Sequence, residues 1–220
     1  MAEDLFGSLD MKVPEAEIEG IEDNLLLMMR DGEVVASSPL RTIENTLLMV
    51  NSDLYTTGTK SIHEVSIPDT VQALSDTVFT LSGYPDSNTE KLVLTLVSRY
   101  IEQQAADLQT GTLRASFQRL SRLDDERGTR EVYDKLGQLA DLESHVYGFP
   151  DWKPPSEMGV TAHQVRDDEI QDTWFVVHRT DTGNDRAMLA INDGPNTWKG
   201  YWTNNTTEIQ LIDDYIVQTF

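Results

Sequence analysis

Cysteine is absent from the sequence. A chain without thiols has no disulfide, no thiolate nucleophile, no cysteine-ligated zinc or iron–sulfur centre, and no thioether bond to a chromophore. Long apolar runs are absent as well: no stretch reaches the roughly 18 residues of a membrane-spanning helix, and the first residues are acidic rather than a basic leader followed by an apolar one. We therefore expect a cytoplasmic protein that neither crosses a membrane nor is exported.

Catalytic signatures are also absent. The sequence contains no Walker phosphate-binding loop, no glycine-rich dinucleotide fingerprint and no nucleophile elbow. The His63-Glu64 pair lacks the second histidine of a zincin motif. His145, His163 and His178 all fall in predicted strands, but they lie far apart in sequence, and we predict ordinary strand-end histidines rather than a shared metal site. We therefore expect no enzyme and no catalytic residues.

Charge of one sign dominates the sequence: 38 acidic residues stand against 17 basic ones, giving a net charge of −21 and an isoelectric point near 4.3. Contacts with phosphate groups need clustered lysine and arginine, so we expect no nucleic-acid or anionic-membrane partner. Intrinsic disorder does not explain the acidity, because 39% of the residues are hydrophobic and four are tryptophan.

The distribution of the acids along the chain distinguishes two further causes of the acidity. Mimicry of nucleic acid, or capture of a basic partner, favours blocks of acids, whereas here the acids are dispersed along the whole chain. Dispersed carboxylates keep a protein soluble where salt screens surface charge, and lysine is scarce, with six residues against eleven arginines. Adaptation to a cytoplasm that contains molar salt fits best.

Periodicity and turn signals predict the organisation of the chain. Residues 1–22 are acidic and lack sustained periodicity, so we expect a mobile tail before a single domain over residues 23–220. Asp31-Gly32 between apolar runs predicts a hairpin, and Ser87-x-x-Glu90 predicts a capping box that starts a long helix ending near Leu108. Further helices are predicted at 39–54, 68–74, about 132–139 and from Thr206, which we expect to cap the last one, and strands at 64–67, 78–82, 113–120, 145–148, 160–165, 174–178, 187–191 and 200–203.

The order of these elements predicts the fold class. Helices alternate with strands in the first part of the chain, and short polar turns join the last four strands. We therefore predict an α/β (mixed α+β) domain with a mixed sheet, an antiparallel C-terminal meander and flanking helices.

The segment 113–152 and two later strands supply the candidate site. Polar and aromatic side chains lie there at or near the ends of predicted elements, where they can converge on a pocket. The candidate ligand-binding residues are Phe117, Arg119, Arg122, His145, Tyr147, Asp151, Trp152, Trp174 and Trp202. Two ordinary structural roles stay open for them: the aromatic residues pack in the core, and the arginines pair with the acids at 124–126.

Several separated blocks resemble the DICT sensory domain, a family named for its occurrence in diguanylate cyclases and two-component systems. The blocks are Gly111–Leu120, Tyr133, His145–Trp152, Ile170–Val177 and Trp198–Thr203, within a resemblance that spans roughly residues 25–220. The stretch 78–99 is typical of haloarchaeal members. The resemblance implies a cytoplasmic signal-input module, commonly joined to a histidine kinase, a diguanylate cyclase or a helix-turn-helix output, with no settled ligand and no catalytic residues to carry over.

We therefore expect a stand-alone sensory domain that binds a small-molecule ligand and regulates a partner such as a histidine kinase or a transcription regulator. The sequence carries no kinase, cyclase or DNA-binding segment, so the output must come from that partner. The absence of cysteine argues against a covalently held bilin, and the cofactor is left unassigned. A ligand-free interaction adaptor is the alternative, whereas an enzyme that uses His145 with Asp151 would lack an activated nucleophile.

Overall fold

The computed structural model describes residues 25–30, 33–39, 41–43, 45–46, 67–82, 91–125 and 128–220. The elements, in chain order, are β1 (Leu25–Arg30), β2 (Glu33–Pro39), α3 (Asp69–Gln72), β3 (Phe79–Ser82), α4 (Leu92–Leu108), β4 (Thr110–Arg119), α5 (Arg122–Asp125), α6 (Thr129–Leu136), β5 (Asp141–Phe149), η3 (Ser156–Met158), β6 (Thr161–Gln164), η4 (Asp168–Asp172), β7 (Thr173–Arg179), β8 (Arg186–Asn192), β9 (Thr197–Thr203) and α7 (Thr206–Thr219). The predicted tail, the Asp31-Gly32 turn, the capping box, most of the helix at 39–54 and residues 64–66 lie outside the described residues.

Seven of the strands form one mixed sheet in the order β3-β9-β8-β7-β4-β5-β6, and β1 and β2 pair as a separate antiparallel hairpin. The pairs β4–β5 and β5–β6 are parallel, and the other neighbours in the sheet are antiparallel. This arrangement confirms the predicted mixed α/β class, and the antiparallel meander β7-β8-β9 is confirmed within it.

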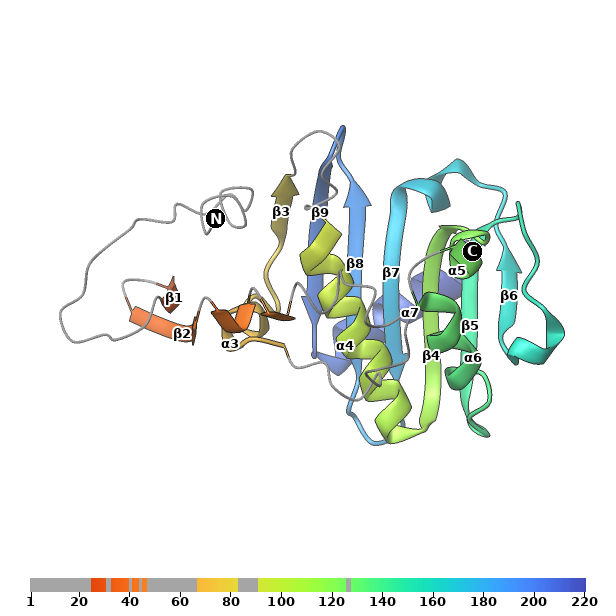
Figure 1. The fold of residues 1–220 in the computed structure, drawn as a ribbon, viewed down its shortest axis with the longest axis horizontal. Helices are drawn as coiled ribbons and strands as arrows, with labels where there is room; N and C mark the ends of the chain where they lie inside the picture. Colours follow the sequence, from red (N-terminus) through yellow and green to blue (C-terminus); the bar gives the residue numbers. More distant parts are fainter. Residues whose placement is uncertain are drawn as a thin grey trace.

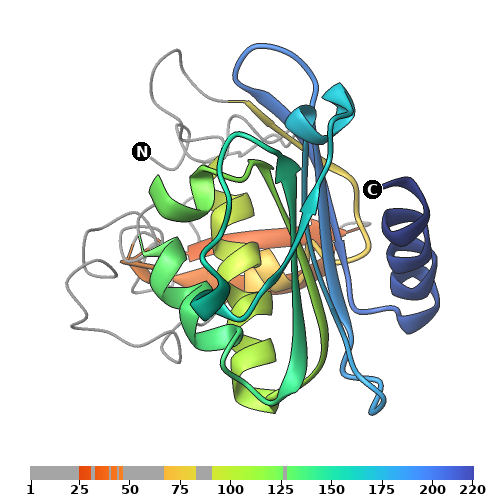
Figure 2. The same cartoon turned by 90° about the vertical axis from the view of Figure 1, so that its right-hand side faces the viewer.

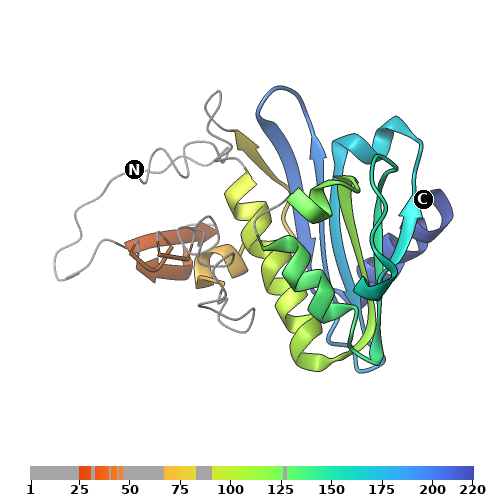
Figure 3. The same cartoon turned by 45° about the vertical axis from the view of Figure 1, so that its right-hand side comes forward.

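Helices cover the two faces of the sheet unequally. Figures 1 and 2 show α4, α5 and α6 on one face and α7 on the other. On its face, α7 packs on β7 and β8, whereas η4 contacts β4, β5 and β7. Figures 1 and 3 show the β1–β2 hairpin and α3 outside the β3 edge of the sheet. On the α7 face the short 3₁₀ helix η4 therefore covers part of β4 and β5, while α7 covers β7 and β8.

Alternation of apolar and polar residues determines which side chains each strand buries. In β4, Leu113 and Ala115 join the core under α4 and α6, while Arg114 points to the α7 side and pairs there with a residue of α7. In β5, Val146 lies in the same core, and Tyr147 belongs to the smaller core cluster beneath α7. The sheet thus has a mainly apolar face and a face on which polar and aromatic side chains mix.

One strand departs from the predicted antiparallel C-terminal portion. The run at 160–165 forms β6, which pairs in parallel with β5 at the sheet edge instead of joining the meander. The crossover through α5 and α6 places β5 outside β4, and β7 takes the other side of β4. The outer side of β5 is then the position left for β6, because a strand on a sheet has two neighbours at most.

Local signals at two element ends refine the predictions. Asn205, not Thr206, caps α7: its side chain accepts hydrogen bonds from the backbone N–H groups of Thr207 and Glu208, at 3.0 and 3.4 Å. Gln118 has φ +58° where the β4–β5 register shifts, so a bulge ends the regular part of β4 and turns the strand at Arg119. Among the described residues, none of the helices is long and apolar enough to cross a bilayer.

Candidate functional site

The sheet separates the nine predicted site residues. Phe117, Trp174 and Trp202 lie on the face covered by α4 and α6, whereas His145 and Tyr147 lie on the face that carries α7. The structure therefore does not bring all nine residues together around one pocket, because a continuous hydrogen-bonded sheet lies between the two groups.

The predicted residues on the α4–α6 face pack in or against the main core. Trp202 is fully buried, and Trp174 packs edge-on against Trp198 with ring centres 6.2 Å apart. Phe117 packs edge-on against Tyr133 at 5.0 Å, and Trp152 is a half-buried neighbour of the same core. For these four side chains, packing in the core accounts for the observed contacts.

A second group gathers where the parallel strands β4 and β5 end. We define the carboxyl-edge cluster as Arg119, Ser121, Asp151 and Gln171. Asp151 accepts hydrogen bonds from the Ser121 backbone N–H at 3.0 Å and from its hydroxyl at 2.7 Å. Arg119 donates to Gln171 at 3.0 Å, and one of its guanidinium nitrogens lies 3.8 Å from Asp151. In open α/β sheets the carboxyl ends of parallel strands commonly hold ligands.

The charges of the carboxyl-edge cluster are those of Asp151 and Arg119, and Arg122 is the remaining predicted arginine. Arg122 is half-buried at the start of α5. Burial alone would raise the pKa of Asp151, but the hydrogen bonds from Ser121 and the charge of Arg119 lower it below its usual value. Among the described residues Arg119 contacts Gln171 and Asp151, whereas Asp124 pairs with Arg130; Glu126, one of the acids expected to pair with the arginines, lies outside the described residues. The cluster therefore holds a carboxylate that stays ionised and an exposed guanidinium.

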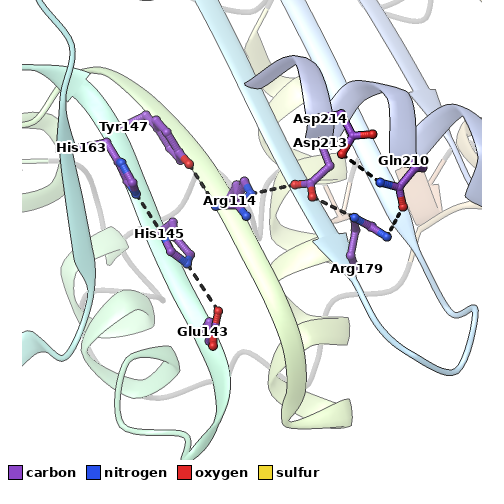
Figure 4. Close-up of polar contacts among 9 residues, drawn as sticks. All are labelled: Arg114, Glu143, His145, Tyr147, His163, Arg179, Gln210, Asp213 and Asp214. Atoms are coloured by element: carbon purple, nitrogen blue, oxygen red, sulfur yellow. Dashed lines mark hydrogen bonds and ion pairs between the residues drawn. The ribbon is translucent and has the colours of Figure 1, made fainter. Parts of the chain in front are cut away.

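A longer set of polar contacts crosses the α7 face of the sheet. We define the sheet network as the residues drawn in Figure 4 that join β6, β5, β4, β7 and α7 through their side chains: His163, His145, Glu143, Tyr147, Arg114, Asp213, Arg179 and Gln210. The register of the strands explains why the first residues of the sheet network are neighbours. Arg114 lies opposite His145 in the β4–β5 pair, and Tyr147 lies opposite His163 in the β5–β6 pair. Alternation then brings all four side chains to one face.

Two histidines form the β6 end of the sheet network. Nδ1 of His145 and Nε2 of His163 lie 2.9 Å apart, which is a hydrogen-bond distance. The His163 ring also stacks on Tyr147, with 4.2 Å between ring centres and 6° between planes. On the far side of His145, its Nε2 lies 3.8 Å from a carboxylate oxygen of the exposed Glu143. The edge strand is thus held to β5 by side chains as well as by the backbone.

Arginines and a buried carboxylate form the α7 end of the network. Arg114 donates through Nη1 to the Tyr147 hydroxyl at 3.0 Å and through Nε to Asp213 Oδ1 at 2.7 Å. Arg179 donates to the other oxygen of Asp213 at 2.9 Å and also to the side chain of Gln210. Asp213 is 6% exposed, so its charge is balanced by two arginines rather than by water.

The surroundings of the sheet network shift the pKa values of its two histidines and of its tyrosine. Burial lowers the pKa of His145, the charge of Arg114 lowers it further, and Glu143 acts in the opposite direction. Burial, followed by the neighbouring His145 and Arg114, lowers the pKa of His163. Burial raises the pKa of Tyr147. At neutral pH the two imidazoles and the phenol of the sheet network are therefore neutral.

Sequence reasoning missed most of this network. It selected His145 and Tyr147 but not Arg114, His163 or Asp213. Alternation along 110–119 and 141–149 was the available signal for Arg114, because it places that residue on the face of His145 once the two strands pair. No local sequence pattern distinguishes Asp213 from the many solvated acids. The position of His163 beside Tyr147 depends on the pairing of β6 with β5, which is set by the tertiary structure.

Hydrogen-bonding and charged side chains make up the described part of the site. Within the described ranges no group of three or more metal-ligating side chains gathers. One open cleft of about 560 Å³ lies beside β6, between the proline-rich loop after β5 and the strand itself, and is lined by Lys153, Pro154, Pro155, Ser156, Glu157, Val160, Ala162 and Gln164. It lies next to the predicted loop at 145–152, on residues that the sequence did not single out.

Comparisons of this chain with protein-family models, with curated proteins and with solved structures find no match.

Proposed function

We propose that this chain is a signal-input domain, in which binding of a small ligand or cofactor at the strands β4, β5 and β6 changes how α7 contacts a partner signalling protein. A histidine kinase or a transcription regulator is the kind of partner that the DICT resemblance implies. The proposed mechanism needs an input region, a connected route and an output element. It requires no catalytic group.

The observation that carries the proposal is the continuity of the sheet network. Its contacts run from His163 on the edge strand, through Tyr147 and Arg114, to Asp213 on α7. Each link is a directional hydrogen bond, an ion pair or a ring stack, so a displacement at one end changes the partners available at the next. A connected set of side chains with two arrangements is the physical basis on which a ligand shifts a population of conformations.

The position of α7 supports its role as the output element. It is the single α-helix on its face of the described sheet, and its outer surface exposes Leu211, Tyr215 and Val217, which are 66%, 55% and 55% exposed. Apolar side chains on an exposed helix face are a common means of contacting another protein. The same surface also favours the alternative function, a ligand-free adaptor that binds its partner through α7.

Native mass spectrometry and an absorption spectrum test the ligand. The full chain, purified in molar KCl, is expected to carry a stoichiometric extra mass that is lost on denaturation. Hydrogen exchange in α7 is then compared before and after removal of that mass, and we expect exchange to increase when it is removed. A clean mass without an absorbing group, together with a tight complex formed by the apo protein, would favour the adaptor instead.

A tyrosine variant tests whether the contacts from His163 through Tyr147 and Arg114 connect the ligand to α7. Tyr147→Phe keeps the ring on His163 but removes the hydroxyl that accepts from Arg114. In molecules of this variant that native mass spectrometry shows to carry the extra mass, we expect α7 no longer to respond to its removal. Tyr100→Phe is the matched control, because it removes the same group from a residue packed against the core on the opposite face, and it is expected to leave the response intact. An unchanged response in Tyr147→Phe would contradict the route through Arg114.

A further inference from the structure

The pair formed by His145 and His163 has the geometry of a direct hydrogen bond. Their ring centres are 5.2 Å apart and the facing nitrogens 2.9 Å apart, so each nitrogen lies close to the line that joins the centres. Two imidazoles that share one metal ion would instead point at a third position, about 2.0–2.1 Å from each nitrogen and off that line. The alignment therefore indicates an N–H of one ring directed at the bare nitrogen of the other.

This bond limits how many protons the pair can hold. A neutral imidazole has one N–H and one bare nitrogen, and an imidazolium has two N–H groups. The contact between the two rings needs one N–H and one bare nitrogen, so it survives with the pair neutral or with one added proton. A second added proton places two N–H groups against each other and removes the acceptor. The bond then becomes a repulsive contact.

The charged and titratable groups around the pair determine where each proton goes. Glu143 on β5 faces Nε2 of His145 and favours the first proton there. Arg114 on β4 opposes protonation of both rings, while Asp213 on α7 acts on His145 in the opposite direction, from behind Arg114. Tyr147 on β5 stacks on His163 as a neutral phenol. Arg179 on β7 reaches the pair only through Asp213. The second proton must therefore bind to His163, beside the positive charges of protonated His145 and of Arg114.

We propose that His145 and His163 form an acid-responsive latch that holds the edge strand β6 to β5 and opens when the pair takes up its second proton. β6 has four residues and pairs with β5 alone at the end of the described sheet order, so its backbone pairing is short. Opening withdraws His163 from Tyr147, which is the first contact of the route to α7. That last step rests on the proposed function, but the latch itself does not.

The sign of the pH dependence follows from the two histidines. Their pKa values in the folded protein lie below the ordinary value of about 6.5, so the unfolded chain binds protons more readily than the folded one. The stability that the neutral pair contributes is therefore complete above about pH 6.5 and is lost as the pH falls through that value towards the lowered pKa values. Acid, not alkali, opens the latch.

Nuclear magnetic resonance of the full chain tests the latch, with imidazole nitrogen signals and backbone amides followed from neutral to acid pH at constant KCl. We expect the two histidines to titrate in two separated, coupled steps. In the second step the amides of β6 are expected to lose about tenfold of their protection from exchange. Independent single steps at the two rings, with β6 protection unchanged, would overturn the proposal.

Two variants and a control locate the effect. His163→Phe keeps a ring on Tyr147 without a titratable nitrogen, so His145 should titrate in one step and β6 should lose its acid response. Glu143→Gln is exposed and should fold normally, and it should move the first step to lower pH. Gln164→Ala changes the next residue of β6, whose side chain lies on the opposite face of the strand beside the cleft, and it should keep both steps. An acid response of β6 that persists in His163→Phe would contradict the latch.

The outcomes separate the latch from the proposed function. If β6 opens in the second step and the amides of α7 shift with it, both are supported. If β6 opens while α7 is unaffected, the latch stands and the route to α7 is wrong. If neither changes, the latch is wrong, and the ligand experiment with Tyr147→Phe still decides the proposed function.

Discussion

Asp213 is the residue on which the charge balance of the sheet network depends. It is buried, and it accepts hydrogen bonds from Arg114 and Arg179 at 2.7 and 2.9 Å. Removing one partner of a buried ion pair leaves the other charge without compensation, which costs more than the pair itself contributes. The neighbouring Asp214 is exposed and accepts from Gln210 on the helix surface. Two adjacent carboxylates thus have very different environments.

The substitution Asp213→Asn should lower the free energy of unfolding by about 3 kcal/mol, because two arginines then share a neutral acceptor. Asp214→Asn is the matched control and should change it by no more than about 0.5 kcal/mol. Denaturant unfolding at fixed KCl measures both. Equal effects of the two substitutions would show that Asp213 is solvated like its neighbour.

Single residues also show where sequence reasoning reaches its limit. His145 and Tyr147 were selected because they are polar and aromatic residues at or near the ends of predicted elements. Trp202 was assigned to the same pocket because sequence position says nothing about which face of the sheet a strand presents. The face depends on the register with neighbouring strands, and a shift of one residue reverses it.

At the scale of elements, the start of β4 depends on Gly111. Its φ is +99°, and a Cβ placed there would lie 2.0 Å from the carbonyl oxygen of Arg179 on the paired strand β7. That oxygen belongs to the backbone and cannot rotate away. Gly183 also has a positive φ, +76°, but no atom lies within 4 Å of a Cβ built on it.

These two glycines give a matched pair of substitutions. Gly183→Ala should cost about 1 kcal/mol through backbone strain alone. Gly111→Ala adds a clash that separates β4 from β7, and it should cost about 3 kcal/mol or more. Thermal and denaturant unfolding provide the comparison. If both variants lose the same stability, the close approach of β7 at Gly111 is incorrect.

Helices and strands were predictable where the hydrophobic pattern extends over many residues and where paired strands are close to each other in the sequence. The strands at 174–178, 187–191 and 200–203 were expected to form an antiparallel meander, and β7, β8 and β9 confirm it. The smaller core under α7 also contains the expected Ile209, Ile212 and Ile216. β6 was a correct strand with a wrong partner, since four residues carry too little pattern to specify a neighbour.

For the whole molecule, the net charge of −21 governs how stability depends on salt. Like charges repel one another most strongly in the compact state. The screening length falls from about 10 Å at 0.1 M salt to about 3 Å at 1 M, so added KCl should relieve this repulsion.

Thermal unfolding should therefore shift upward by several degrees between about 0.1 and 1 M KCl, since about 1 kcal/mol corresponds to roughly 2–4 °C in a domain of this size. Sucrose at equal osmolality stabilises by exclusion without screening charge, and it should produce a smaller rise. A midpoint that stays constant, or falls, with KCl would count against adaptation to molar salt.

The pairing of β3 with β9 has a consequence for synthesis of the chain. Phe79 lies opposite Gly200, so β3 pairs with a strand that is translated much later than β3 itself. β3 therefore has no β9 to pair with while the residues between the two strands are translated. A nascent chain halted before residue 197 has its β8 edge uncovered, and we expect such a chain to need a chaperone until β9 is complete.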